Sequence, residues 1–172
     1  MTITEAINAR RSVRKYKDGD KPIPQDQLDL ILEAAMKAPT ANHLRPWRFI
    51  VVTNRDKLLA LGDAHPYARM VKQASAAIIV CIPKEPGDEP SVIPQDCAAA
   101  TENILLQATG LGLGTCWCGV FPYEERMAPI GALLGDALPA GFAPFNLIAL
   151  GYPNEGFGSR GFYEKEKVIY VS

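Results

Sequence analysis

The sequence predicts an α+β domain in which helices pack in layers on a sheet. The 172 residues are 48% hydrophobic and 22% charged, which is the size and composition of one globular domain. Helix-like and strand-like segments both occur along the chain, without internal repeats. Only some of the strands are separated by helices long enough for a parallel crossover, so a doubly wound parallel sheet is disfavoured.

Helical segments precede and separate two strands in the N-terminal half. Pro24 suits the first turn of the second helix, Leu28 and Ile31 lie on its apolar face, and Pro39 ends it. The expected elements are helices over residues 4–9, 24–38 and 57–61, the last capped by Gly62, a helical turn after Pro66, and strands over 48–53 and 76–82.

A long apolar helix dominates the C-terminal half. Residues 95–111 are rich in alanine and leucine and apolar on more than one face, which fits either a core helix or a subunit interface. Strands are expected at 115–121, 145–150 and 168–171, a surface loop at 83–94, and a helical stretch that begins at Pro122 and is interrupted or restarted at Pro129.

Charge and composition exclude several classes of partner. A net charge of −1, without basic stretches that contain aromatic residues, argues against nucleic acid. Apolar runs such as residues 76–82 are too short to span a bilayer, and the N-terminus lacks the apolar core of a signal peptide. No membrane association is expected, and the predicted location is the cytoplasm.

The four cysteines are expected to stay reduced, as small buried residues. We expect Cys116 and Cys118 to point to opposite faces of their strand, and His43 and His65 have no helical i,i+4 pairing. No metal site is therefore predicted.

The most informative polar cluster is Arg10-Arg11-Ser12-Val13-Arg14, directly after the first helix. The planar fork of arginine suits phosphate, and the Ser12 hydroxyl adds a donor, so the cluster is a candidate anion site. A solvated face or a helix C-terminal charge is the simpler alternative.

Two common enzyme motifs are absent from the sequence. Gly110-x-Gly112-x-Gly114 follows a helix instead of opening one, so it is no dinucleotide fingerprint, and a Gly-x-Ser-x-Gly nucleophile motif does not occur.

Five segments together resemble the nitroreductase family of flavin mononucleotide (FMN) enzymes, and they span nearly the whole chain. They are Arg10-Arg11-Ser12-Val13-Arg14, Ala38-Pro39-Thr40-Ala41-Asn42-His43-Leu44-Arg45-Pro46-Trp47, residues 95–106, residues 112–119 and Leu150-Gly151-Tyr152-Pro153. The resemblance implies a three-layer sandwich with a central, mostly antiparallel sheet flanked by helices. It also implies a single FMN-binding domain over residues 1–172 and an intertwined homodimer with flavin sites at the subunit interface. The C-terminal tail, about residues 153–172, would wrap onto the partner subunit.

The same resemblance implies a set of cofactor-binding residues. Arg10, Arg11, Ser12 and Arg14 would hold the FMN phosphate and the pyrimidine edge of the ring, where negative charge develops on reduction. Arg160 resembles a C-terminal phosphate-binding arginine, and solvated arginines are the alternative for Arg11 and Arg160. Pro39, Thr40, Ala41 and His43 would reach the flavin of the other subunit, and Cys118 and Gly119 would offer backbone groups to flavin N5. No catalytic side chain is named.

The chain departs from the family pattern at three positions. His43 stands where the family has asparagine, Arg45 where it has glutamine, and Met70 roughly where it has a lysine near the pyrimidine ring. The short stretch between Phe121 and Leu134 leaves no room for a large lid, which indicates an open site.

The activity implied by the resemblance is ping-pong oxidoreduction. NAD(P)H would give a hydride to flavin N5, and a nitroaromatic, quinone or similar small-molecule acceptor would then take the electrons. Three alternatives stay open: a flavin-binding storage or sensing protein without turnover, a flavin-dependent dehalogenase or flavin-fragmenting enzyme, and a cysteine-based redox protein that uses Cys116 and Cys118.

Overall fold

The computed structural model describes residues 1–17, 19–85, 87, 91–156 and 161–171. Its helices are α1 (Ile3–Ala9), α2 (Gln25–Met36), α3 (Arg55–Ala64), α4 (Ile93–Gly110) and α5 (Glu124–Leu134), with short 3₁₀ turns η1 (Ala41–His43), η2 (Arg69–Gln73), η3 (Gly135–Ala137) and η4 (Lys165–Lys167). Its strands are β1 (Tyr16–Lys17), β2 (Arg48–Val52), β3 (Ala76–Pro83), β4 (Gly114–Gly119) and β5 (Phe142–Pro153).

The strands form a five-stranded sheet organised around β5. This strand pairs with β1, β3 and β4, and β2 pairs with the other edge of β3. All pairings between these strands are antiparallel, and Ser12 and Thr115 add an isolated parallel bridge. The predicted mostly antiparallel sheet is therefore confirmed.

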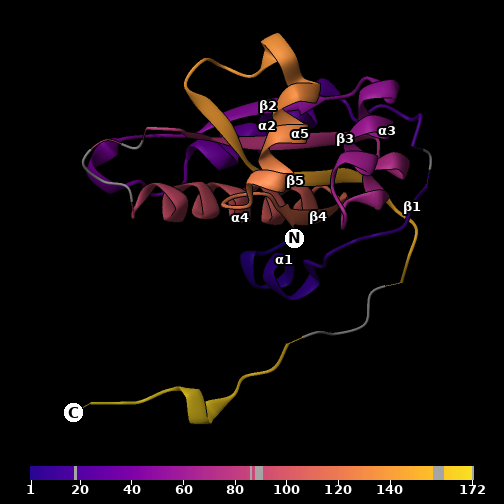
Figure 1. Cartoon of the computed structure of the whole chain (residues 1–172). Coiled ribbons are helices and arrows are strands. Elements are labelled where there is room, and N and C mark those ends of the chain that lie inside the picture. Colours follow the sequence, from indigo (N-terminus) through magenta and orange to yellow (C-terminus); the bar gives the residue numbers. More distant parts are fainter. Residues whose placement is uncertain (18, 86, 88–90, 157–160, 172) are drawn as a thin grey trace.

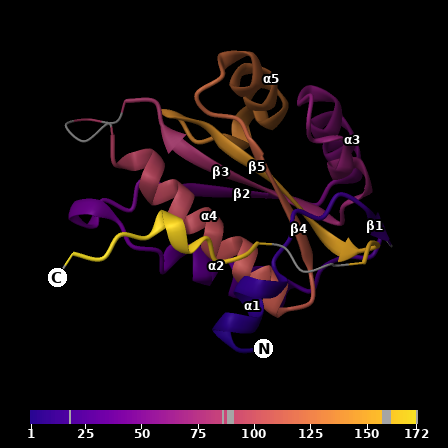
Figure 2. The ribbon, with the colours of Figure 1, turned by 90° about the horizontal axis from the view of Figure 1, so that it is seen from below.

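Alternate residues of β3 and β5 face opposite sides of the sheet, and each side carries its own apolar core. On one side, Ile78 and Ile148 pack with residues of α2 and α4. On the other side, Ile79 and Leu147 pack with residues of α3 and α5. Figure 1 shows α4 on one side of the sheet and α3 and α5 on the other, and Figure 2 is the view from the side of α4. The predicted three-layer sandwich is confirmed, with α4 as a core helix.

Some element boundaries differ from the prediction. Gly62 lies inside α3, which continues to Ala64, instead of capping the helix. A Cβ atom on Gly62 would come within 2.5 Å of Cγ of Lys72, so the glycine leaves room for this side chain. Pro129 lies on an exposed position inside a continuous α5, so it removes one backbone donor without ending the helix. The two-residue strand β1 was not predicted, because it is too short to form a pattern.

The strand predicted for residues 168–171 is absent from the described part of the tail. Residues 161–171 contain the turn η4 and extend away from the rest of the chain in Figure 1. Several of their apolar side chains are exposed, with exposed fractions of 83% for Phe162, 87% for Ile169 and 94% for Val171. A strand needs a sheet edge to pair with, and none of the five described strands pairs with these residues.

Candidate functional site

The arginine cluster lies in an extended segment that joins α1 to β1. The Val13 N–H donates to the Thr115 carbonyl at 2.8 Å, and Ser12 bridges to Thr115, so the segment is fixed against β4. Successive side chains of an extended chain point to opposite sides, so Arg11 and Val13 face one side of the segment and Arg14 faces the other. The packing agrees, because Arg14 lines one cavity and Arg11 and Val13 line another.

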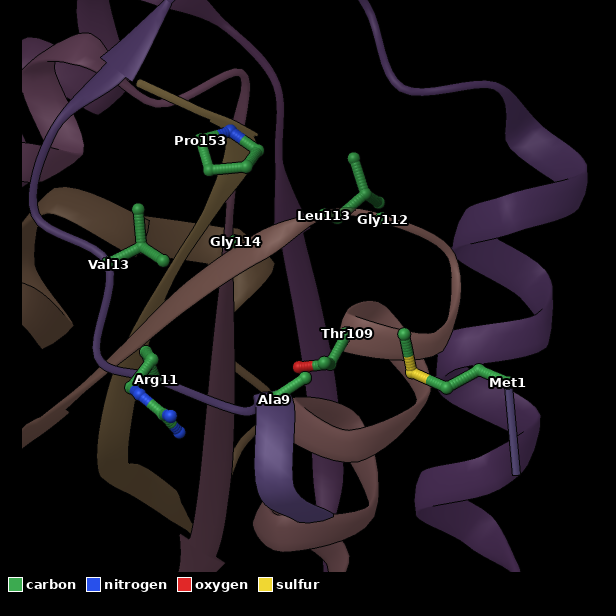
Figure 3. A pocket seen from close by; sticks show the side chains of 9 residues that line it. All are labelled: Met1, Ala9, Arg11, Val13, Thr109, Gly112, Leu113, Gly114 and Pro153. Atoms are coloured by element: carbon green, nitrogen blue, oxygen red, sulfur yellow. The ribbon is translucent and has the colours of Figure 1, made fainter. Parts of the chain in front are cut away.

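The cavity beside Arg11 has a volume of about 180 Å³ and mostly apolar walls. Figure 3 shows Arg11 and Val13 on one side of it and Met1 and Leu113 on the other. The Arg11 Nη1 atom donates to the carbonyls of Asn8 and Arg10, both at 2.7 Å. Arg11 therefore supports the last turn of α1 and faces away from Arg14.

A larger cavity of about 520 Å³ lies between β4 and the residues that follow α3; we call it the β4 cavity. It brings Arg14 together with Arg69, Cys118 and Gly119, which are far apart in the sequence. Arg14 and Arg69 contribute positive charge, and none of the described residues that line the cavity is an aspartate or glutamate. The Glu155 carboxylate lies next to Arg14 and accepts from its backbone N–H at 2.6 Å. A Cβ atom built on Gly119 would meet nothing within 4 Å, so the backbone there is open to a ligand.

His65 is a buried residue that fixes one wall of the β4 cavity. Only 1% of its surface is exposed. Its Nδ1 accepts from the Tyr67 N–H at 3.2 Å, so Nε2 carries the proton and donates to the Gly119 carbonyl at 2.9 Å. The imidazole therefore ties the segment after α3 to the end of β4.

The Gly119 carbonyl accepts a second hydrogen bond, from Nη1 of Arg126 in α5 at 2.9 Å. The Arg126 guanidinium also lies over the ring of Tyr123, 4.1 Å from its centroid, and 5.5 Å from the centroid of Tyr67. The sequence indicated neither His65 nor Arg126 as a site residue, because their contacts to Gly119 exist only once α3, α5 and β4 meet.

The loop between α2 and β2 is held by a buried carboxylate at the start of α4. Asp96 accepts from the Thr40 hydroxyl at 2.7 Å and from the Ala41 N–H at 3.2 Å. The Thr40 oxygen in turn accepts from the Arg45 N–H at 3.0 Å. These bonds hold a loop with positive φ at Asn42 (48°), His43 (59°) and Arg45 (47°), a conformation that costs free energy at each non-glycine residue.

The predicted site residues are brought together only in part. Arg14, Cys118 and Gly119 line the β4 cavity, whereas Pro39, Thr40, Ala41 and His43 do not. Arg10 lies beside the Glu102 carboxylate, with 3.5 Å between Nε and Oε1, and the Ser12 side chain is exposed. Arg160 lies outside the described residues.

Cys116 and Cys118 point to the same face of β4, in contrast to the prediction. Residues two apart in a strand share a face, and both belong to the core on the α3 and α5 side. A hydrogen bond with the Cys118 thiol, helped by Arg14, lowers the pKa of Cys116 against the effect of burial. The same hydrogen bond and burial raise the pKa of Cys118.

Within the described ranges, no three or more His, Cys, Asp or Glu side chains are grouped as a metal site would require. Among these residues there is also no helix of the length and apolar character needed to cross a membrane.

Known proteins resemble the chain over nearly its whole length. It matches the model of the Nitroreductase family at residues 7–77 and 63–152. A protein of Methanothermobacter thermautotrophicus, provisionally named NADH dehydrogenase/NAD(P)H nitroreductase, is 45% identical over 168 residues, covering 98% of this chain and 86% of that protein. An FMN-dependent nitroreductase of Clostridium difficile superimposes with a TM-score of 0.84 at 32% identity, over 95% of each chain. A provisionally named nitroreductase of Desulfovibrio desulfuricans, solved in complex with FMN, superimposes with a TM-score of 0.82 at 28% identity, over 100% of this chain and 98% of that one.

Proposed function

Because the chain belongs to the nitroreductase family, we propose that it is an NAD(P)H-dependent oxidoreductase that binds FMN in the β4 cavity. The electron acceptor is a nitroaromatic, a quinone or a similar small molecule. The observation that carries the proposal is the β4 cavity itself, because its charge and its open backbone suit a flat ring that becomes negative on reduction.

The residues of the β4 cavity fit a flavin ring. Arg14 and Arg69 place positive charge where the pyrimidine edge would lie, and such charge favours the reduced cofactor. Arg69 supplies the cation that the family pattern assigns to a lysine and that Met70 cannot provide. The open space over Gly119 lets a planar ring approach the backbone of β4.

Several of the predicted residues, with Arg69, have a role in the proposed arrangement. Arg10 and Ser12 would hold the phosphate, Arg14 and Arg69 would face the pyrimidine edge, and Cys118 and Gly119 would offer their backbone to flavin N5. Arg11 is left out, because it supports α1 and lines the other cavity. Arg10 would exchange its contact with Glu102 for the phosphate.

When bound, FMN supplies the redox chemistry, because it can take a hydride from NAD(P)H and pass the electrons to an acceptor in a ping-pong cycle. The residues of the chain bind and orient both substrates and exclude water. No side chain of the β4 cavity is required as a general base, so none is named as catalytic.

We also propose a homodimer in which residues 39–43 of each chain complete the site of the other. The loop between α2 and β2 lies at the end of the molecule opposite β1 in both Figure 1 and Figure 2. No described residue of this loop lines the β4 cavity of its own chain, and the exposed apolar tail offers a means of holding a second chain. A cytoplasmic location stays a prediction.

The absorption spectrum of the purified protein tests the cofactor. Flavin bands are expected, and a colourless protein that cannot be reconstituted with FMN would overturn the proposal. Bleaching of the bands by NADH or NADPH distinguishes an oxidoreductase from a storage or sensing protein. Activity that survives Cys116→Ser and Cys118→Ser distinguishes it from a cysteine-based redox protein.

A further inference from the structure

Arg126 is held at the rim of the β4 cavity without being neutralised. A guanidinium offers several N–H donors in a rigid fork. Within the described part of the chain, its contacts are the Gly119 carbonyl and the rings of Tyr67 and Tyr123. None of these contacts carries a negative charge, so the charge and the remaining donors of Arg126 are available to a ligand.

The rings of Tyr67 and Tyr123 form an apolar, solvent-exposed surface next to the Arg126 guanidinium. Their exposed fractions are 68% for Tyr67 and 48% for Tyr123. Tyr67 also lines the β4 cavity, so a molecule in the cavity meets the ring beside which Arg126 lies. A flat apolar surface next to a fixed cation suits a planar molecule that carries an anionic group.

The charge of the β4 cavity favours the same kind of ligand. Arg14 and Arg69 line it, and the described lining residues contain no carboxylate. An oxyanion that enters the cavity therefore moves toward positive charge, and the fork of Arg126 can bind a carboxylate or phosphate with two hydrogen bonds. Because Arg126 is already positioned by Gly119, little side-chain freedom is lost on binding.

We propose that Arg126, Tyr67 and Tyr123 form a clamp that binds the oxyanion of a planar substrate at the mouth of the β4 cavity. This inference rests on the proposed function and deepens it, because it makes the preferred substrate anionic. The oxyanion can be a carboxylate on the electron acceptor or a phosphate of the nicotinamide donor, and the experiment separates these two sources.

The first measurement is binding without a donor, so that no turnover occurs. FMN-loaded protein is titrated with 4-nitrobenzoate and with its neutral analogue 4-nitrobenzamide, by calorimetry. If the oxyanion belongs to the acceptor, Arg126→Leu should weaken 4-nitrobenzoate binding by about 10- to 100-fold and change 4-nitrobenzamide binding by less than about twofold. Arg126→Lys, which keeps the charge but not the fork, should fall between the wild-type and leucine proteins.

Arg48→Leu is the matched control. Arg48 makes the same kinds of contact, since its Nη1 donates to the Trp47 carbonyl at 2.8 Å and its guanidinium lies 4.9 Å from the centroid of Phe142. The difference lies in the partners: Gly119 and Tyr67, which Arg126 contacts, line the β4 cavity, whereas Trp47 and Phe142 do not. This variant removes the same charge from the protein and should leave both affinities unchanged.

The second measurement is flavin reduction by NADH and by 1-benzyl-1,4-dihydronicotinamide, which carries no phosphate. If Arg126→Leu slows flavin reduction by NADH but not by 1-benzyl-1,4-dihydronicotinamide, the oxyanion is a phosphate of the donor. If the variant weakens only the binding of 4-nitrobenzoate, the oxyanion is the carboxylate of the acceptor. Either result supports the clamp.

Two outcomes would overturn the clamp. One is that Arg126→Leu loses as much affinity or reduction rate with the neutral compounds as with the charged ones, and the other is that it loses none with any compound. A wild-type protein that retains no FMN overturns the proposed function as well, whereas an active enzyme without charge preference overturns the clamp alone.

Discussion

At the scale of single residues, His65 joins parts of the candidate site that are distant in the sequence. Both of its nitrogens bond to backbone groups, one after α3 and one at the end of β4. These two bonds require a neutral ring with the proton on Nε2. With Arg126, this side chain therefore helps to orient the Gly119 carbonyl beside the cavity.

Replacing His65 tests this dependence. His65→Leu should lower the free energy of unfolding by about 1–3 kcal/mol, because the Tyr67 N–H loses its acceptor and Gly119 loses a donor. His65→Gln offers both a donor and an acceptor and should recover part of the stability and of the FMN affinity. Urea unfolding and FMN titration of the two variants provide the measurements, and equal losses for leucine and glutamine would contradict the role.

Only part of the β4 cavity could be predicted from the sequence. Arg14, Cys118 and Gly119 belong to recognisable motifs, so their roles could be stated before the fold was known. Arg69 stands next to Met70 in the stretch compared with the family's lysine but was given no role, and Arg126 belongs to no motif. Arg69 lines the cavity and Arg126 contacts its lining residue Gly119 only in the folded chain. For Arg11 the sequence left phosphate contact and solvation open, because a charge cluster in sequence does not reveal which side of an extended chain each member faces.

At the scale of elements, the loop between α2 and β2 depends on α4. Thr40 was predicted as a cofactor contact, but its hydroxyl already donates to Asp96 and accepts from Arg45. These bonds oppose the cost of three non-glycine residues at positive φ. The first turn of α4 therefore sets the shape in which the loop would meet a partner subunit.

Thr40 variants test the coupling between this loop and α4. Thr40→Val keeps the side-chain shape but leaves Asp96 and the Arg45 N–H each short of a partner, so the free energy of unfolding should fall by about 1–3 kcal/mol. Thr40→Ser keeps the hydroxyl and should lose much less. Chemical unfolding compares the two, and a valine variant as stable as the serine variant would show that the hydrogen bonds contribute nothing.

The elements with strong apolar periodicity were predicted well, and the failures have physical causes. The long helix and the strands at 48–53 and 76–82 agree with α4, β2 and β3 apart from their ends. The alternating residues 168–171 did not form a strand, because alternation creates a strand only where a neighbouring strand accepts its hydrogen bonds. Gly62 was predicted as a cap because glycine is common at the ends of helices, whereas here it makes room for the side chain of Lys72.

At the scale of the whole molecule, buried thiols make stability depend on alkaline pH. Burial raises the pKa of Cys81 to about 12, and burial with a contribution from Asp96 raises the pKa of Cys97 to about 12. Between the ordinary value of 9.0 and about 12, the folded chain keeps protons that the unfolded chain loses. Stability therefore falls as pH rises through this range.

The slope of this fall can be measured. Each of the two thiols should contribute up to about 1.4 kcal/mol per pH unit above the unfolded pKa. The double variant Cys81→Ala, Cys97→Ala should be less stable than the wild-type protein at neutral pH, because the substitutions leave two small cavities. Its free energy of unfolding should nevertheless fall less steeply than that of the wild type as the pH rises. Urea unfolding in reducing buffer at several pH values compares the slopes, and parallel slopes would refute the assignment.

The C-terminal tail tests the homodimer. A chain shortened to residues 1–156 should sediment as a monomer at micromolar concentration and retain less FMN, because the exposed apolar residues of the tail would be lost. Replacing both Ile169 and Val171 by serine in the 172-residue chain should also weaken dimerisation. Analytical ultracentrifugation gives the result, and a monomeric full-length protein would contradict the homodimer.

The position of β5 has a consequence for synthesis of the protein. It comes last in sequence among the strands that the structure describes, yet β1, β3 and β4 all pair with it. A nascent chain therefore cannot assemble the centre of the sheet until residue 153 has left the ribosome. Until then β3, with its continuous apolar sequence, presents an unpaired edge to other chains. The period most prone to aggregation should thus come late in translation and end when β5 emerges.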